Sequence, residues 1–195
     1  MTDVDFAAMR AAMVASQLRT SDVNDPAVLA AMATVPREEF VPAARRETCY
    51  TDRTIPLGNG ATMNPPLATG RLLTVAQVEA GEKVLLLGDA TGYTAALLRH
   101  MGAEVVAVSA SPAKGNSKGA PYDVIVIDGV IDAFPDALSA QLAEGGRVAA
   151  GLNVRGVSRL VGGRKAGGVL GLVAVADMEM ARAQGFEPEK ARFAF

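Results

Sequence analysis

The sequence predicts an α/β protein with a doubly wound, mostly parallel sheet and an antiparallel hairpin at its C-terminal end. Four short apolar runs follow residue 80, and a helical segment lies between the first and second runs and another between the third and fourth. Two further apolar segments with glycines between them come after these runs. Strand–helix–strand alternation implies right-handed crossovers, which make successive strands parallel. With 195 residues, half of them hydrophobic and 21% charged, the chain has enough apolar material for one domain.

The N-terminal third is expected to hold two helices and then a long loop. Apolar residues at helical spacing mark residues 6–18 and 28–35. Asp25 suits the N-cap of the second helix and Pro26 its first helical position. Residues 42–66 are rich in Pro, Gly, Thr and Asn, which indicates a loop with short extended pieces.

The middle of the chain carries the predicted parallel sheet. Its apolar runs are continuous rather than alternating, which is typical of strands buried on both faces. Strands are expected over residues 83–87, 104–108, 122–127 and 146–150, and helices over residues 91–101 and 133–142.

The last predicted elements form an antiparallel pair. Residues 157–161 and 169–175 are apolar, and Gly162-Gly163 and Gly167-Gly168 lie between them. This pattern predicts a glycine-tipped hairpin, which commonly forms one edge of such a sheet.

Residues 110–121 interrupt the alternation, because they are small and polar and contain several Gly and Pro. A doubly wound fold usually has a helix and a strand here, so we expect a flexible loop and a sheet shortened by about one strand and one helix. Strand 104–108 then becomes an edge. Since exposed apolar edges tend to be covered or paired, we expect the loop or a second subunit of a homo-oligomer to cover it.

Composition excludes several classes of function. The formal charge is −2, from 19 basic and 21 acidic residues, which disfavours nucleic acid as a partner. Cys49 and His100 are the only residues of their types, so neither an intrachain disulfide nor a Cys-based zinc site can form, and no metal site is expected. No apolar run is long enough to span a membrane, and Asp3 and Asp5 do not suit a secretory signal. We therefore expect a cytoplasmic protein without membrane contact.

A glycine-bearing turn follows the first predicted strand. Residues 84–93 read VLLLGDATGY, and a strand that leads into such a turn at a helix start is the ligand-binding corner of nucleotide-type folds. The alternative is a tight turn with glycine for packing only.

Two further segments could carry chemistry. Residues 57–66 combine turn formers with side chains able to hydrogen-bond a carboxylate or an amide, although a rigid surface loop would have the same composition. Asp128 ends a buried strand, where open α/β sheets place residues that contact ligands. It could equally serve as a cap.

Several blocks, in order over most of the chain, resemble one enzyme family. The most specific is Val35-Pro-Arg-Glu-Glu-Phe-Val-Pro42. The family is that of the protein-L-isoaspartate O-methyltransferases. The other blocks are residues 13–18 (MVASQL), 50–52 (YTD), 55–58 (IPLG), 60–66 (GATMNPP), 92–93 (GY), 120–123 (APYD), 131–135 (IDAFP), 141–147 (QLAEGGR) and 155–160 (RGVSRL).

The resemblance implies a Rossmann-like methyltransferase fold, a helical N-terminal extension and S-adenosylmethionine as cofactor. The family methylates the misplaced α-carboxylate of isoaspartyl residues in damaged proteins, so isoaspartyl proteins or peptides are the expected partners. A carboxylate is already a nucleophile at pH 7, and catalysis is mainly positioning and desolvation, so no catalytic His or Cys is needed. We expect one domain over residues 1–195, with N-terminal helices and substrate loop in 1–78 and a Rossmann-like core in 79–195.

The resemblance also assigns site residues. Asn64 and Thr62 lie in the family's substrate loop and are the expected catalytic residues. The expected cofactor-binding residues are Gly88, Asp89, Ala90, Thr91, Gly92, Ser109 and Asp128.

The chain departs from the family pattern at five of its motif positions. Asn64 stands where the family has the serine that contacts the substrate carboxylate, Pro65 replaces a glutamine, and Ala90 replaces a glycine. Leu86 and Ser109 stand where acidic residues are usual. An acidic residue at position 109 would take both ribose hydroxyls, and each such charge-assisted hydrogen bond is worth roughly 1.5–3 kcal/mol. A non-catalytic member that acts in binding or assembly is therefore the alternative to an active enzyme.

Overall fold

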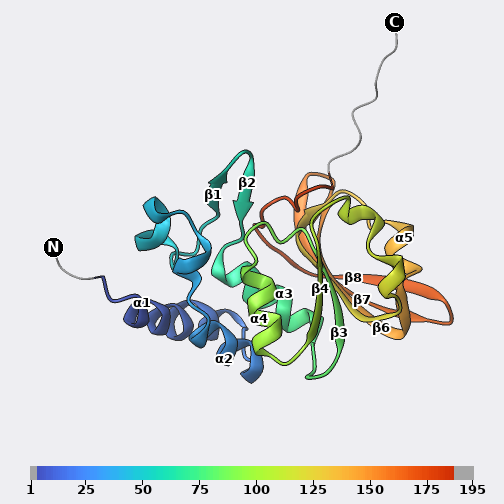
Figure 1. Cartoon of the computed structure of the whole chain (residues 1–195), viewed down its shortest axis with the longest axis horizontal. Helices are drawn as coiled ribbons and strands as arrows, with labels where there is room; N and C mark the ends of the chain where they lie inside the picture. Colours follow the sequence, from blue (N-terminus) through green and yellow to red (C-terminus); the bar gives the residue numbers. More distant parts are fainter. Residues whose placement is uncertain (1–3, 187–195) are drawn as a thin grey trace, which may run out of the picture.

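The computed structural model describes residues 4–186 (Figure 1). Its central element is a six-stranded mixed β-sheet. Its strand order is β4-β3-β5-β6-β7-β8, with the first four strands parallel and the last two antiparallel. The predicted fold class is confirmed, including the shortened parallel part. The strands are β3 (Lys83–Leu87), β4 (Glu104–Val108), β5 (Tyr122–Ile131), β6 (Leu142–Val154), β7 (Val157–Ala166) and β8 (Val169–Asp177).

The central strand β3 shows why the apolar runs are continuous. Val84 and Leu86 belong to the core on one face of the sheet, and Leu85 and Leu87 belong to the core on the other. Side chains alternate between faces along a strand, so a strand covered on both sides must be apolar throughout. The predicted bounds of β3 and β4 are confirmed, whereas β5 and β6 run further than the sequence indicated.

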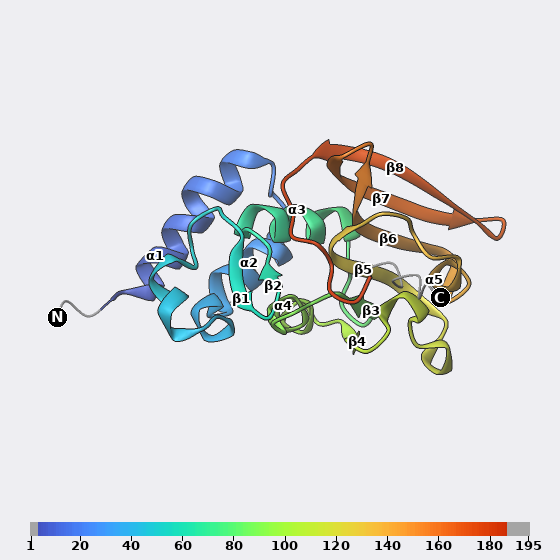
Figure 2. The ribbon, with the colours of Figure 1, turned by 90° about the horizontal axis from the view of Figure 1, so that it is seen from above.

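One face of the sheet is covered by helices α3 and α4, with α2 behind them (Figures 1 and 2). Asp25 caps α2 as predicted, because its carboxylate accepts hydrogen bonds from the Ala27 and Val28 amides at 2.8 and 3.1 Å. The helical segments of this half are α1 (Phe6–Met13), η1 (Val14–Leu18), η2 (Arg19–Ser21), α2 (Pro26–Thr34), η3 (Arg37–Phe40), η4 (Ala43–Thr48), α3 (Pro66–Ala76) and α4 (Tyr93–His100).

The sequence analysis assigned no helix to α3. Two prolines at its start and a glycine inside it are loop signals, yet Pro66 occupies the first helical turn, where its missing N–H costs nothing. Gly70 is needed for packing, since a Cβ there would come within 3.2 Å of Val23 and 3.3 Å of Met32. The glycine therefore lets neighbouring segments approach the helix closely.

The other face of the sheet has a thinner cover. Helix α5 (Asp136–Ser139) is much shorter than the helix predicted over residues 133–142. The predicted loop 110–121 is confirmed, with two single turns, η5 (Pro112–Lys114) and η6 (Ser117–Gly119). Gln141, just after α5, connects the loop to this helix. Its side-chain oxygen accepts from the Asn116 amide, and its side-chain nitrogen donates to the carbonyls of Lys114 in the loop and Ala137 in α5, each at 2.8 Å.

The loop and the edge strand β4 follow the prediction in part. β4 is an edge of the sheet, as expected. Among the described residues, the side-chain hydrogen bonds between the loop and other segments run to Gln141, Tyr122 and Lys83 rather than to β4. Pairing of this edge with a second subunit stays a prediction.

The C-terminal hairpin is confirmed, but its predicted tip was partly wrong. Gly167 and Gly168, with φ of 59° and 78°, form the turn. Gly162 and Gly163 lie inside β7 and pair with β8. They are glycines because of crowding: a Cβ on Gly162 would come within 2.8 Å of the Val75 side chain.

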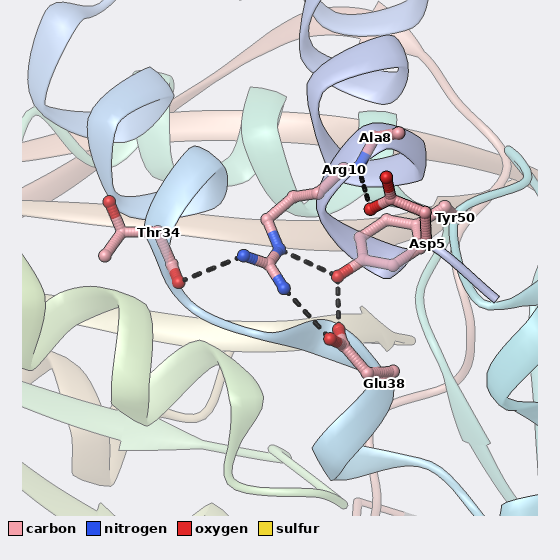
Figure 3. A network of polar contacts seen from close by, with 6 residues as sticks. All are labelled: Asp5, Ala8, Arg10, Thr34, Glu38 and Tyr50. Carbon is pink, nitrogen blue, oxygen red and sulfur yellow. Dashed lines mark hydrogen bonds and ion pairs between the residues drawn. The ribbon is translucent and has the colours of Figure 1, made fainter. Parts of the chain in front are cut away.

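A polar network joins the N-terminal segments (Figure 3). The Arg10 guanidinium on α1 donates to the Tyr50 hydroxyl and to Glu38, each at 2.9 Å, and Tyr50 also donates to Glu38. Burial and the Glu38 hydrogen bond raise the pKa of Tyr50. The network ties α1, η3 and the segment after η4 together. It thereby anchors the loop that leads to hairpin β1 (Ile55–Gly58) and β2 (Ala61–Met63).

Within residues 4–186, no helix combines the length and the apolar character needed to cross a membrane.

Candidate functional site at the carboxyl edge of the sheet

The glycine turn and Asp128 meet at one edge of the sheet. Parallel strands β3 and β5 are adjacent, so the turn after β3 lies beside the second half of β5. Gly88 and Gly92 have φ of 77° and 84°, a conformation that favours glycine. The structure thus brings together two segments that the sequence analysis singled out separately.

Asp89 holds the glycine turn against the start of α4. Its carboxylate accepts hydrogen bonds from the amides of Thr91 (3.1 Å), Gly92 (2.8 Å) and Ala95 (2.9 Å). A carboxylate at a helix N-terminus satisfies free N–H groups and suits the helix dipole. Asp89 thus acts as a structural cap here, while Ala90 beside it is exposed.

Asn64 and Asp128, predicted for different roles, are hydrogen-bonded to each other. The Asn64 amide donates to one Asp128 oxygen at 2.7 Å, and the Thr94 hydroxyl donates to the other at 2.8 Å. Asn64 comes from the segment after β2, Thr94 from α4 and Asp128 from β5. Three segments far apart in the chain therefore converge on one carboxylate.

This environment changes the acidity of Asp128. Burial, and then the nearby Asp89 charge, raise the pKa of Asp128 to about 6. Hydrogen bonds from Thr94 and Asn64 and the charge of Arg37 oppose the shift. Asp128 is therefore a carboxyl group that titrates close to neutral pH.

Arg37 is a buried cation beneath this cluster that the sequence analysis did not single out as a functional residue. Its side chain is fully buried and donates to the carbonyls of Cys49 (2.7 Å) and Asn64 (2.5 Å). The guanidinium carbon lies 5.0 Å from the centre of the Tyr93 ring. Burial lowers the pKa of Arg37. The available signal was its place in the block of residues 35–42, the most family-specific of the chain.

Arg37 also leaves polar atoms unsatisfied. Its Nη1 and the Tyr93 hydroxyl are buried without a hydrogen-bond partner among the described residues. Because Arg37 grips the main chain of Asn64, it fixes the residue whose amide meets Asp128. Arg37 therefore positions the cluster from below.

Residues 178–186, which we call the strap, cross the carboxyl edge after β8 (Figure 2). The Asn64 side-chain oxygen accepts a hydrogen bond from the Ala181 amide at 2.7 Å. Ala183 lies over the glycine turn, so a Cβ placed on Gly88 would come within 3.0 Å of its own Cβ. The sequence analysis assigned no structure to this segment, which reads MEMARAQGF.

Two predicted site residues lie outside the cluster. Thr62 is on β2, paired with Pro56, and Ser109 is exposed just after β4. Neither has a side-chain hydrogen bond among the contacts of the described residues. Asn64 and Asp128 are in direct contact with each other, and Asp89 binds Thr91 and Gly92 within the adjacent glycine turn. Within residues 4–186 no group of three His, Cys, Asp or Glu residues could hold a metal ion.

Solved structures of known proteins share this fold. A protein-L-isoaspartate O-methyltransferase superposes with a TM-score of 0.75 at 21% identity, over 91% of this chain and 67% of that chain. A Plasmodium falciparum protein, described as a putative enzyme of the same name in complex with S-adenosyl-L-homocysteine, gives 0.73 at 14% identity, over 94% of this chain and 100% of that one. At these identities the likeness concerns the fold.

Sequence comparison identifies the family. The family profile of protein-L-isoaspartate(D-aspartate) O-methyltransferase matches residues 9–113 and 103–170. The protein-L-isoaspartate O-methyltransferase of Koribacter versatilis is 37% identical over 168 residues, which cover 73% of this chain and 76% of that protein. A relative of the same name from Rhodopseudomonas palustris is 36% identical, over 73% of this chain and 69% of its own length. The chain belongs to the protein-L-isoaspartate O-methyltransferase family.

Proposed function

We propose that this protein is an S-adenosylmethionine-dependent carboxyl methyltransferase that acts on isoaspartyl residues of damaged proteins. Family membership supports the reaction class. The observation that carries the proposal is the polar cluster of Asn64, Thr94 and Asp128 beside the glycine turn, at the edge where open α/β sheets bind ligands. The partners proposed are isoaspartyl proteins and peptides.

The site residues keep the roles expected from the sequence as part of this proposal. Asn64 and Thr62 would contact the substrate carboxylate, and an amide can donate the hydrogen bond that a hydroxyl would. The substrate needs no general base, because a carboxylate is ionised at neutral pH. The residues proposed to hold the cofactor are Gly88, Asp89, Ala90, Thr91, Gly92, Ser109 and Asp128.

In the conformation described, this corner does not fit a nucleoside cofactor. Ala183 lies directly over Gly88, and Gly185 lies near Ser109, where a ribose would be expected. Asn64 is engaged on both sides, with Asp128 and with the Ala181 amide. The closed corner supports a second candidate, a non-catalytic family member that acts in binding or assembly.

We also propose that the chain forms one domain, residues 1–195, with part of that range outside the described residues. One hydrophobic core joins Met13 and Leu18 of the N-terminal segments to Val84 and Val124 of the sheet. Residues 1–78 and 79–195 are then two regions of one domain rather than two domains, because they share a hydrophobic core.

Methyl transfer from labelled S-adenosylmethionine to an isoaspartyl peptide tests the first proposal. The same peptide with normal aspartate is the matched substrate control. We expect label on the isoaspartyl peptide alone. Thermal shift and calorimetry with S-adenosylhomocysteine report cofactor binding separately, because a ligand that binds the folded state raises its stability. Absence of both binding and transfer at about 1 mM ligand would favour the non-catalytic candidate.

Variants at Asn64 locate the substrate contact. Asn64→Ala is expected to lower kcat/KM for the isoaspartyl peptide by roughly 10- to 150-fold, because one hydrogen bond to a charged group is worth roughly 1.5–3 kcal/mol. Asn64→Ser restores a donor and should recover part of the loss. Asn24→Ala, at an exposed position, is the matched control and should leave the activity unchanged.

A further inference from the structure

We propose that the strap, residues 178–186, and the methyl-donor cofactor bind the same corner and exclude each other, so that the cofactor enters only when the strap leaves. The inference rests on the proposed use of S-adenosylmethionine. It assigns a gating role to a segment that carries none of the family motifs quoted above.

Main-chain contacts hold the strap as a short extra strand beside β5. The Val130 amide donates to the Ala181 carbonyl at 2.8 Å, and the Ala183 amide donates to the Val130 carbonyl at 3.0 Å. Val130 and Arg182 form a parallel bridge, and Asn64 accepts from the Ala181 amide. The strap therefore binds as an extended peptide, held mainly through its backbone.

The strap packs directly against two glycines, Gly88 and Gly129. A Cβ on Gly129 would come within 2.7 Å of the Ala181 carbonyl oxygen and of the Ala183 amide nitrogen. A Cβ on Gly88 would come within 3.0 Å of the Ala183 Cβ. Gly88, which would let a cofactor approach the backbone, is thus covered by the strap, so the space above it cannot hold both at once.

The strap also reaches the second strand end. A Cβ on Gly185 would lie 2.7 Å from Pro112 and 3.7 Å from the Ser109 carbonyl oxygen. The strap thus covers the ends of β3, β4 and β5. These are the strand ends from which the expected cofactor residues come.

Few strong interactions fasten the strap. Two of its three buried side chains are alanines, Ala181 and Ala183, which bury little apolar area. The third is Met180, and the strap's Met178 and Phe186 are only partly buried against the core. Its ion pair, Arg182 with Asp132 at 2.6 Å, is about half exposed on each side, and exposed pairs contribute little to stability. Segments with few buried apolar contacts open at low free-energy cost, so the strap can leave without unfolding the sheet.

Hydrogen exchange of the full-length protein tests the proposal directly. Without ligand, the amides of Val130, Ala181 and Ala183 should be protected. Addition of S-adenosylhomocysteine should increase exchange over residues 178–186, because the strap must leave. Binding of S-adenosylhomocysteine with unchanged strap protection would overturn the proposal and would leave the proposed methyltransferase function intact.

A variant that opens the strap gives the second test. Ala183→Glu cannot fit over Gly88 and should bind S-adenosylhomocysteine at least tenfold more tightly in calorimetry, since a closed majority lowers the apparent affinity by the open fraction. Ala174→Glu, the same change at an exposed position of β8, should bind like the wild type. Equal affinity of the wild type and a folded Ala183→Glu variant overturns the proposal.

The remaining outcomes are equally decisive. If neither the wild type nor Ala183→Glu binds S-adenosylhomocysteine at about 1 mM, the gating role falls together with the proposed cofactor use. If circular dichroism shows that Ala183→Glu does not fold, the exchange measurement on the wild type decides. Arg182→Ala, which removes only the exposed ion pair, should increase strap exchange in either case.

Discussion

Asp128→Asn is expected to stabilise the protein at pH 7.5 and to flatten its stability between pH 4 and 6. The Asp128 carboxyl titrates at about 6 in the folded protein, against an ordinary value of 3.8. Between these two values the folded state binds the proton more tightly than the unfolded state. Stability is therefore highest at low pH for this group and falls as pH rises through the window.

The magnitude follows from the shift. About two pKa units correspond to about 3 kcal/mol of lost stability once the carboxyl is fully ionised. Asparagine removes the charge and can still accept from Asn64, and the Thr94 hydroxyl can turn to accept from the new amide group. Rearranged hydrogen bonds cost about 1 kcal/mol each, which leaves a net gain of about 1–2 kcal/mol at pH 7.5.

Urea unfolding at a series of pH values from 4 to 8 measures this prediction. The free energy of unfolding of the wild type should fall relative to the variant as pH rises from 4 to 7. The two curves should cross in the acidic part of this range, because at low pH only the cost of the rearranged hydrogen bonds remains in the variant. Parallel curves, or a variant less stable than the wild type at pH 7.5, would show that Asp128 is not a destabilising buried carboxylate.

Three further substitutions test the scaffold that holds the site. Asp25→Ala removes the cap that serves Val28 and should cost about 1 kcal/mol in thermal unfolding, with Asp25→Asn close to wild type. Arg37→Met leaves two buried carbonyls unpaired at about 1–3 kcal/mol each, and it should also raise the apparent pKa of the Asp128 step in the pH series. Glu38→Gln breaks the ion pair between Glu38 and Arg10, and both of these side chains are mostly buried. The free energy of unfolding in urea should fall by about 1–3 kcal/mol, and an unfolding midpoint equal to that of the wild type would refute this.

The sequence alone identified the elements whose local signals agree with their burial. β3 has the predicted bounds because a strand buried on both faces must be apolar at almost every position. β4 also has the predicted bounds, but it was expected to be buried and its residues are half-buried or exposed, because it lies at the edge of the sheet. Asp25 and Pro26 marked the start of α2 because a cap is a local interaction between near neighbours. The sequence also placed Asp128 at the end of a buried strand, which the continuous apolar run before it indicates.

Only the tertiary structure decided how these parts meet. α3 was missed because Gly70 is required by neighbouring segments, and Gly162 was misplaced at a turn because Val75 crowds it inside β7. The hydrogen bond between Asn64 and Asp128 joins residues 64 positions apart, and the contact between Asn64 and Ala181 joins residues 117 apart. Such contacts depend on how strands and helices pack, and no local pattern encodes them. The sequence therefore indicates the strands and the family, whereas the cover that residues 178–186 form over the glycine turn depends on the tertiary structure.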